Sequence, residues 1–314
     1  MEIISKDHTN IGAVLVPTDF SDLSYKALRY AAALVRKVGA KLHVVHVAEI
    51  DFGVPGAALP GRNPLVDDSD EARTLQDELR AMVDPIAPEF HGRTGRAFDQ
   101  IVRFAGELET DLIVMSTHGL TGFRRMLFGS NAERVVQHSS CPVLVVRANQ
   151  PEQPAGEKLR LGTILVPIDF SASSEETLRR AIAFAQQFDA RLVLLHAVSA
   201  PVVPAAAPYA VASLDVPLEQ ARGTAEAEMQ ALVQRTAFNG VAYETQIATG
   251  FPGETICSYA DRAGADLIIM STHGRTGLAH VLIGSVAEHV VWHALSPVLV
   301  VPGSGKNLPV AGVS

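Results

Sequence analysis

Two short segments of the chain combine glycine, serine and histidine in a spacing that could bind phosphate. Residues 115–130 read MSTHGLTGFRRMLFGS, and residues 270–285 read MSTHGRTGLAHVLIGS. Glycine lets a ligand approach the backbone closely. A helix that begins at the closing serine would present N–H groups without intrahelical partners, at the positive end of its dipole. Together these features are typical of a phosphate cradle at a helix N-terminus.

Neither segment matches the two common nucleotide fingerprints. No Gly-Lys-Ser/Thr closes the loop, as a P-loop requires, and a dinucleotide-binding GxGxxG would follow the first strand. The simpler interpretation is that Gly119 and Gly129 are turn residues and that Ser130 caps a helix. Because the same loop occurs twice, each time between an apolar run and a helix, the phosphate interpretation is favoured.

The loops belong to a repeat that spans most of the chain. Three further matches are VLVPTDFS (14–21) with ILVPIDFS (164–171), DLIVMSTHG (111–119) with DLIIMSTHG (266–274), and CPVLVV (141–146) with SPVLVV (296–301). We therefore predict two homologous domains, 1–148 and 161–303. A polar segment rich in Pro and Gly, 149–160, is predicted to link them, and 304–314 to form a C-terminal tail.

Each copy alternates apolar runs with amphipathic segments. In the first copy the pattern predicts strands at 13–16, 42–47, 89–94, 112–115 and 143–146, and helices that begin near 21, 70, 98 and 130. The third strand, EFHGRT, is expected to be weak or distorted, whereas its counterpart at 242–248 is clear. Strands that are apolar throughout and alternate with helices indicate a parallel sheet covered on both faces. The predicted fold class is α/β, with two tandem doubly wound, Rossmann-like domains, each a five-stranded parallel sheet flanked by helices.

In open sheets of this kind the ligand crevice lies beyond the carboxyl ends of the strands, where the strand order reverses. The segments directly after the strands are Asp19, the residues after Val47, and 116–119 in the first copy. Their counterparts are Asp169, the residues after Ala197, and 271–274. One crevice per domain is therefore expected to collect these segments.

The spacing Gly119-x9-Gly129-Ser130, repeated as Gly274-x9-Gly284-Ser285, resembles the nucleotide-binding motif of the universal stress protein family. VPTDFS after the first strand and the closing CPVLVV and SPVLVV resemble that family too, and the resemblance covers nearly the whole chain as two tandem copies. It implies domains like those of the adenine nucleotide α-hydrolases. Members that bind ATP carry Gly-x2-Gly-x9-Gly-Ser/Thr, and here Ser116 and Ser271 stand where they have the first glycine.

The resemblance implies a site for ATP or a related adenine nucleotide, alone or with Mg²⁺. Asp19, Asp169 and the backbone at Val47 and Ala197 would lie near adenine or ribose, and the motif glycines and serines near the phosphates. The whole predicted set is Pro17, Asp19, Val47, Met115, Ser116, Gly119, Gly129, Ser130 and Asn131, with Pro167, Asp169, Ala197, Met270, Ser271, Gly274, Gly284, Ser285 and Val286. Asp19 and Asp169 are equally suited to capping the helix that follows.

Several other residues in the sequence could in principle catalyse, bind metal or bind phosphate. His118 and His273, inside the loops, more often make structural hydrogen bonds than catalyse. His46 and His196 have no Cys, Asp or Glu cluster beside them in sequence, and Cys141 and Cys257 are not at metal spacing, so no metal site and no disulfide are predicted. The first loop has Arg124 and Arg125 where the second has Ala279 and His280, while Arg275 replaces Leu120. Unless these charges are merely solvated, the two sites should differ in phosphate affinity.

Composition bounds the remaining possibilities. The chain has 314 residues, 47% hydrophobic and 19% charged, with a formal net charge of −8. Such a chain is globular, and its charge argues against nucleic acid as the main partner. We expect no signal peptide and no membrane span, hence a cytoplasmic protein. The apolar terminal strands need covering. Because the resembling family commonly uses this strand for dimer contact, the two halves are expected to pair as an intramolecular pseudo-dimer, or the chain to form a homodimer.

Three function classes stay open at this point. The first is a stress-response protein whose contacts are regulated by bound adenine nucleotide, and the second is a slow ATPase or phosphotransferase. The third is an interaction scaffold that binds no nucleotide. Because the sequence shows no Walker lysine and no evident base beside the phosphate loop, we expect a nucleotide-dependent regulator rather than a fast enzyme, with weak ATPase activity left open.

Overall fold

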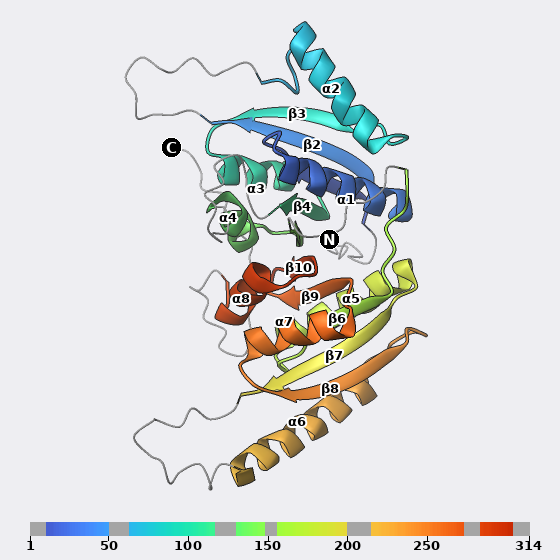
Figure 1. Ribbon diagram of the computed structural model, residues 1–314, viewed down its shortest axis with the longest axis vertical. Coiled ribbons are helices and arrows are strands. Elements are labelled where there is room, and N and C mark those ends of the chain that lie inside the picture. Colours follow the sequence, from blue (N-terminus) through green and yellow to red (C-terminus); the bar gives the residue numbers. More distant parts are fainter. Residues whose placement is uncertain are drawn as a thin grey trace, which may run out of the picture. The chain divides into compact units, whose positions relative to one another are not determined.

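The structure is a computed structural model that describes residues 11–49, 63–116, 130–147, 156–199, 215–272 and 283–303 (Figure 1). His118, His273, Arg124, Arg125, Arg275, Ala279 and His280, all considered above, lie outside these residues. By its internal contacts the chain divides into two units. One comprises Met1–Arg160 with Leu299–Ser314, and the other comprises Leu161–Val298.

The first unit holds a parallel sheet with strand order β3-β2-β1-β4-β5. Its strands are β1 (Ala13–Pro17), β2 (Lys41–Ala48), β3 (Glu89–Thr94), β4 (Leu112–Ser116) and β5 (Val143–Val146). The central strands are buried along their length, as their unbroken apolar sequences predicted.

Four helices connect these strands: α1 (Asp22–Val38), α2 (Asp70–Val83), α3 (Ala97–Glu107) and α4 (Ser130–His138). Helix α1 begins where Ser21 accepts a hydrogen bond from the Ser24 amide, and it ends at Gly39, whose φ of 77° is left-handed. Because crossovers between parallel strands are right-handed, reversal of the strand order after β3 places α1 and α2 on one face and α3 and α4 on the other. The contacts of α1 with α2, and of α3 with α4, agree with this arrangement.

The second unit repeats the pattern with strand order β9-β6-β7-β8, again parallel. Its elements are β6 (Thr163–Pro167), α5 (Ala172–Phe188), β7 (Arg191–Val198), α6 (Asp215–Arg235), β8 (Tyr243–Thr249), α7 (Pro252–Ala263), β9 (Leu267–Ser271) and α8 (Ser285–His293). The last strand, β10 (Val298–Val301), contains the boundary between the units. The predicted tandem α/β fold with parallel strands and flanking helices is confirmed.

The expectation of a weak or distorted strand at 89–94 is wrong. Strand β3 pairs with β2 at every residue from Glu89 to Thr94. Gly92, which suggested distortion, instead makes room for a neighbouring segment: a Cβ there would lie 2.6 Å from a Val66 methyl and 2.8 Å from the Asn63 side chain. The Asn63 amide in turn donates to the carbonyl of His46 at 2.9 Å, on the paired strand. The glycine therefore serves packing on the strand's surface.

The strand pairing also locates the insertion that makes the second copy longer. Glu244 lies opposite Val193 just as Glu89 lies opposite His43, so the extra residues fall between β7 and β8. In that interval α6 has 21 residues, whereas α2 has 14.

No helix in the described part of the chain combines the length and the hydropathy needed to cross a bilayer.

Candidate functional site

The second unit contains a cavity of about 280 Å³ at the carboxyl ends of β6, β7 and β9. These strands include the pair β6 and β9, between which the strand order reverses, so the cavity lies where open α/β sheets bind ligands. The N-terminal turns of α5, α7 and α8 close its sides. The lining residues are Pro167, Ile168, Asp169, Ser174, Leu195, His196, Ala197, Pro252, Ile256, Met270, Ser271, Thr272, Gly284, Ser285, Val286 and Ala287.

The cavity brings together the site residues predicted for the second copy. Pro167, Asp169, Ala197, Met270, Ser271, Gly284, Ser285 and Val286 all line it, and Gly274 lies outside the described residues. In the first copy, Pro17, Asp19, Val47, Met115 and Ser116 lie at or just beyond the carboxyl ends of β1, β2 and β4. Ser130 and Asn131 begin α4, while Gly119 and Gly129 lie outside the described residues.

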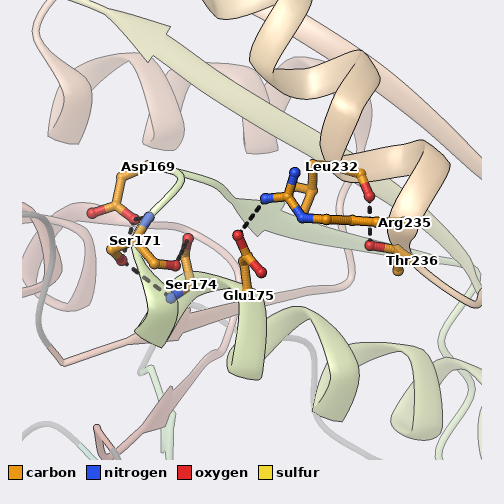
Figure 2. A network of polar contacts seen from close by, with 7 residues as sticks. All are labelled: Asp169, Ser171, Ser174, Glu175, Leu232, Arg235 and Thr236. Atoms are coloured by element: carbon orange, nitrogen blue, oxygen red, sulfur yellow. Dashed lines mark hydrogen bonds and ion pairs between the residues drawn. The ribbon is translucent and has the colours of Figure 1, made fainter.

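Asp169 is held by the turn between β6 and α5. Its Oδ1 accepts hydrogen bonds from the Ser171 amide at 3.0 Å and the Ser171 hydroxyl at 2.6 Å. Ser171 in turn caps α5 by accepting from the Ser174 amide at 3.2 Å. Figure 2 shows this chain of contacts and, beyond it, the ion pair of Glu175 with Arg235 that fastens the first turn of α5 to the end of α6. The residue that caps α5 is therefore Ser171, and Asp169 supports this cap from the turn without bonding a helix amide in the contacts above. The carboxylate of Asp169 also lines the cavity.

The same turn occurs in the first copy. Asp19 accepts from the amide and the hydroxyl of Ser21 at 3.1 and 2.6 Å, and Ser21 caps α1. One difference lies beside it. Buried Thr18 bonds the Ser24 hydroxyl at 3.0 Å and accepts from the Phe20 amide at 3.1 Å. The second copy has Ile168 at that position, so the two turns share their backbone but differ in polarity next to the carboxylate.

Both turns contain a phenylalanine in left-handed conformation. Phe20 and Phe170 each have a φ of 62°, which is costly for a bulky side chain and is concentrated at functional turns. Each ring packs on a histidine two residues before the end of the next strand, with ring centroids 4.5 Å apart for Phe20 and His46 and 4.6 Å apart for Phe170 and His196. This packing holds the turn that presents the aspartate.

His196 is itself oriented by the turn. Its Nδ1 lies 2.7 Å from the carbonyl oxygen of Ile168, and because a carbonyl only accepts, this nitrogen carries the proton. In the neutral ring Nε2 is then the acceptor. Sequence reasoning considered His196 only as a metal ligand and missed it as a lining residue. The signal available was its place near the carboxyl end of a strand whose neighbour is followed by Asp169.

Helix α8 points its N-terminus at the cavity. Gly284 is its N-cap and supplies no capping side chain. The Gly284 amide donates to the Thr272 carbonyl at 2.7 Å, and the first intrahelical bond runs from the Glu288 amide to the Gly284 carbonyl at 2.9 Å. The amides of Ser285, Val286 and Ala287, which precede that bond, are the donors that a helix start offers to an anion. The Gly284 amide itself is already bonded to the backbone that follows β9.

Gly284 nevertheless favours the close approach of α8 to the backbone after β9. A Cβ there would lie 3.3 Å from the carbonyl oxygen of Thr272, in the backbone that leaves β9. Helix α7 depends on a second glycine, because a Cβ on Gly253 would lie 2.6 Å from the His289 ring of α8. Gly253 thus lets the two helix N-termini lie beside each other. The contribution of Pro252 and Ile256 from α7 to the cavity was missed from sequence.

Ser271, which replaces the first motif glycine, is the last residue of β9 and is half-buried. Neither it nor Ser116 has positive φ. The extended backbone at this position is open to any residue, so the serine imposes no conformational cost relative to glycine. Among the described lining residues, only Asp169 and His196 are titratable, and neither is a lysine or arginine that could neutralise phosphate.

In comparison with known proteins, both halves of the chain match the same family model. A model of the Universal stress protein family matches residues 10–147 and 161–302. The chain is 35% identical over 145 residues to universal stress protein MJ0531 of Methanocaldococcus jannaschii, covering 44% of this chain and 84% of that one. It is 26% identical over 312 residues to universal stress protein Slr1230 of Synechocystis, covering 91% and 98% respectively.

The fold is shared with a solved structure of similar length. A universal stress protein from Archaeoglobus fulgidus superposes with a TM-score of 0.64 at 21% identity, over 95% of this chain and 99% of that chain. At this identity the likeness concerns the arrangement of the elements. It agrees with the tandem α/β architecture described above.

Proposed function

The chain belongs to the universal stress protein family, and we propose that it binds ATP or a related adenine nucleotide at the cavity of the second unit and at the equivalent place in the first. Binding would regulate the protein's contacts rather than feed rapid catalysis. The observation that carries the proposal is the start of α8, which has no side-chain cap and lines a cavity at the reversal of strand order.

The phosphates are assigned to the α8 end of the cavity. There the amides of Ser285, Val286 and Ala287 and the Ser285 hydroxyl would donate to phosphate oxygens. Such donors need no positively charged side chain, because the helix N-terminus carries partial positive charge. Gly284 would contribute by keeping α8 close to β9 and not by its own amide, which is already bonded. This refines the role expected from the motif.

The nucleoside is assigned to the opposite, apolar part. Pro167, Leu195 and Met270 offer apolar surface for a base, and the carboxylate of Asp169 can accept hydrogen bonds from ribose hydroxyls. The cavity of about 280 Å³ approaches the lower end, about 300 Å³, of typical small-molecule pockets, which suits a compact nucleoside better than an extended cofactor. Ser271 would present the same backbone as the family's glycine.

The enzyme alternative has one feature in its favour. Asp169 could hold a Mg²⁺ ion bound with ATP, since Mg²⁺ is commonly bound through one or two carboxylates and the substrate phosphates. Its Oδ1, however, already accepts two hydrogen bonds from Ser171. A general base positioned toward a phosphate would be required for fast hydrolysis. We therefore place ATP hydrolysis second to binding.

The test uses the purified full chain. Mass spectrometry of the supernatant after denaturation identifies any nucleotide that co-purifies, and calorimetric titration with ATP, ADP, AMP and GTP, each with and without Mg²⁺, measures affinity. Gly284→Val should weaken ATP binding at least about tenfold, equivalent to about 1.4 kcal/mol, because the side chain would crowd the Thr272 carbonyl and displace the start of α8.

Gly223→Val is the matched control, because Gly223 lies exposed in α6 and a Cβ there meets no atom within 4 Å. It should leave ATP affinity unchanged. Circular dichroism melts would show whether each variant stays folded. No co-purified nucleotide together with no heat at millimolar ATP would leave the scaffold alternative. Phosphate release well above that of a Gly129→Val/Gly284→Val double variant would favour the enzyme.

A further inference from the structure

The first unit holds a cluster of metal-ligating side chains on two neighbouring strands. His43 lies on β2, and Glu89 and His91 lie on the neighbouring β3. Strand register pairs His43 with Glu89, and His91 is two residues further along, on the same face of the sheet. One ligand atom from each of the three side chains lies within 4.8 Å of the other two.

Two of the three distances between these atoms match a tetrahedral metal site, and the third, between the His91 and Glu89 ligand atoms, is no longer than 4.8 Å. His43 Nδ1 lies 3.2 Å from His91 Nε2 and 3.5 Å from the Glu89 Oε2. Ligands bound to Zn²⁺ at about 2.0–2.1 Å in tetrahedral geometry are about 3.3–3.4 Å apart. We propose that His43, Glu89 and His91 form a binding site for a divalent transition metal of the Zn²⁺ class, with the fourth position open to water.

The surroundings suit a partly enclosed ion. The side chain of His43 is 7% exposed and that of Glu89 is 56% exposed, so one side of the cluster is in the protein and the other in solvent. His91 packs edge-on against Phe104 of α3, with ring centroids 4.8 Å apart. This contact fixes the orientation of the ring. An ion would replace the contact between the two rings, the contact of His43 with Glu89 and the solvent near Glu89.

The charged groups around the cluster determine how much repulsion a bound cation would meet. Lys41 and Arg93 are the neighbouring cations, and Glu89 is the neighbouring anion. Arg93 lies over the Phe104 ring and pairs with Glu107 at 2.7 Å, which offsets its repulsion of a bound cation. Burial is the main cause that lowers the pKa of both histidines, and neutral imidazole is the form that binds metal.

The simplest competing interpretation is a hydrogen bond between two neutral histidines, one donating and the other accepting. Both interpretations need the rings at this separation. They differ in the carboxylate, because a bond between the rings does not require Glu89, whereas a three-ligand site does. The two facing nitrogens are His43 Nδ1 and His91 Nε2, and one of them carries the shared proton. Tautomerisation can move this proton to the other nitrogen of the same ring, which leaves a lone pair on both facing nitrogens for an ion.

The second unit supplies an internal comparison. By strand register, Val193, Glu244 and Gln246 occupy the positions of His43, Glu89 and His91. Both histidines are thus replaced, and no three-ligand group of this kind occurs among the described residues of that unit. The paired substitution His43→Val with His91→Gln therefore installs side chains that the same fold already accommodates at the same register.

The experiment measures Zn²⁺ binding to the tag-free full chain after treatment with a chelator. Competition against a chromophoric chelator of micromolar affinity gives stoichiometry and affinity. We expect one site per chain, loss of that site in His43→Val/His91→Gln, and at least about tenfold weaker binding in Glu89→Gln, since loss of a ligand should cost no less than loss of an outer-shell partner. Co²⁺ should give the visible spectrum of a tetrahedral ion in the native chain alone.

A control disrupts another histidine pair that could bind metal, in the described part of the second unit. His289 and His293 stack in α8 with ring centroids 4.1 Å apart, so His293→Ala is made in parallel and should leave the Zn²⁺ site intact. Loss of the site in His293→Ala with retention in the double variant would overturn the proposal, as would failure of the native chain to compete for Zn²⁺. Glu89→Gln, at a mostly exposed side chain, keeps the test decisive if the double variant does not fold. Unchanged affinity in Glu89→Gln would reduce the cluster to a hydrogen-bonded pair.

Discussion

At the scale of single residues, two motif positions have different physical roles. Gly284 allows α8 to lie close to the backbone after β9, because a Cβ there would lie a tight 3.3 Å from the Thr272 carbonyl oxygen, and its amide is already bonded to Thr272. Ser271 stands where the family's ATP-binding members have glycine, yet it ends a strand with extended backbone. A glycine there would add space in the cavity but no new conformation. The motif therefore contains one glycine that favours close packing and one position open to serine.

The substitution Ser271→Gly tests this distinction. Because the strand backbone keeps its path, we expect ATP affinity within about threefold of the native value, a difference below about 0.7 kcal/mol, measured by calorimetry. Stability should fall by about 0.5–1 kcal/mol, the usual cost of glycine inside a regular element, as read from urea unfolding. Tenfold tighter binding in Ser271→Gly would instead mean that the serine side chain obstructs the ligand.

At the scale of elements, the two copies reach the same arrangement through different contacts. Gly253 lets α7 lie against His289 of α8, whereas the matching pair in the first copy is Phe98 of α3 under the guanidinium of Arg134 of α4, 4.8 Å from the ring centroid. A close helix contact and a cation–π contact thus serve corresponding helix pairs. The N-termini of α4 and α8 need not be equally rigid.

The C-termini of corresponding helices also differ between the two copies, and the difference can be tested. Helices α1 and α5 both end in a left-handed residue, Gly39 with a φ of 77° in the first copy and Asp189 with a φ of 56° in the second. Left-handed backbone is unfavourable for residues with a Cβ, although aspartate tolerates it better than most. We expect Asp189→Gly to raise the free energy of unfolding by up to about 1 kcal/mol and Gly39→Asp to lower it by a similar amount.

Urea unfolding followed by circular dichroism measures both changes. A Cβ added at Gly39 meets no atom within 4 Å, so the effect there is conformational and not steric. Stabilisation by Gly39→Asp, or destabilisation by Asp189→Gly beyond 1 kcal/mol, would show that the aspartate makes a compensating contact at the end of α5.

At the scale of the whole molecule, the chain carries two versions of one strand-to-helix turn. The turn that presents the aspartate is the same in both, but buried Thr18 in the first copy bonds Ser24 and Phe20, and Ile168 replaces it in the second. The loop sequences differ further at Arg124 and Arg125 and at Arg275. Two adenine nucleotides per chain with unequal affinities are therefore expected.

Calorimetry on single-site variants should separate the two expected binding events. Gly284→Val should weaken one binding event at least about tenfold and leave the dissociation constant of the other within about twofold, because sites without shared partners usually act independently. Gly129→Val should do the converse. Disappearance of both events in either variant would show that the sites are coupled or that only one exists.

Pairing of the two halves through their terminal strands, the domain limits and a cytoplasmic location stay predictions.

The sequence by itself determined the repeat, the alternation of strands and helices and the carboxyl-end location of the candidate site, because these follow from local periodicity and from the rules of parallel sheets. Only the tertiary structure decided that the Gly284 amide is bonded, that α7 lines the cavity, and that the strand at 89–94 is regular. It also decided that His43 meets Glu89 and His91, more than forty residues away. The reason is that strand register and helix approach are set by contacts between distant segments, which no local pattern records.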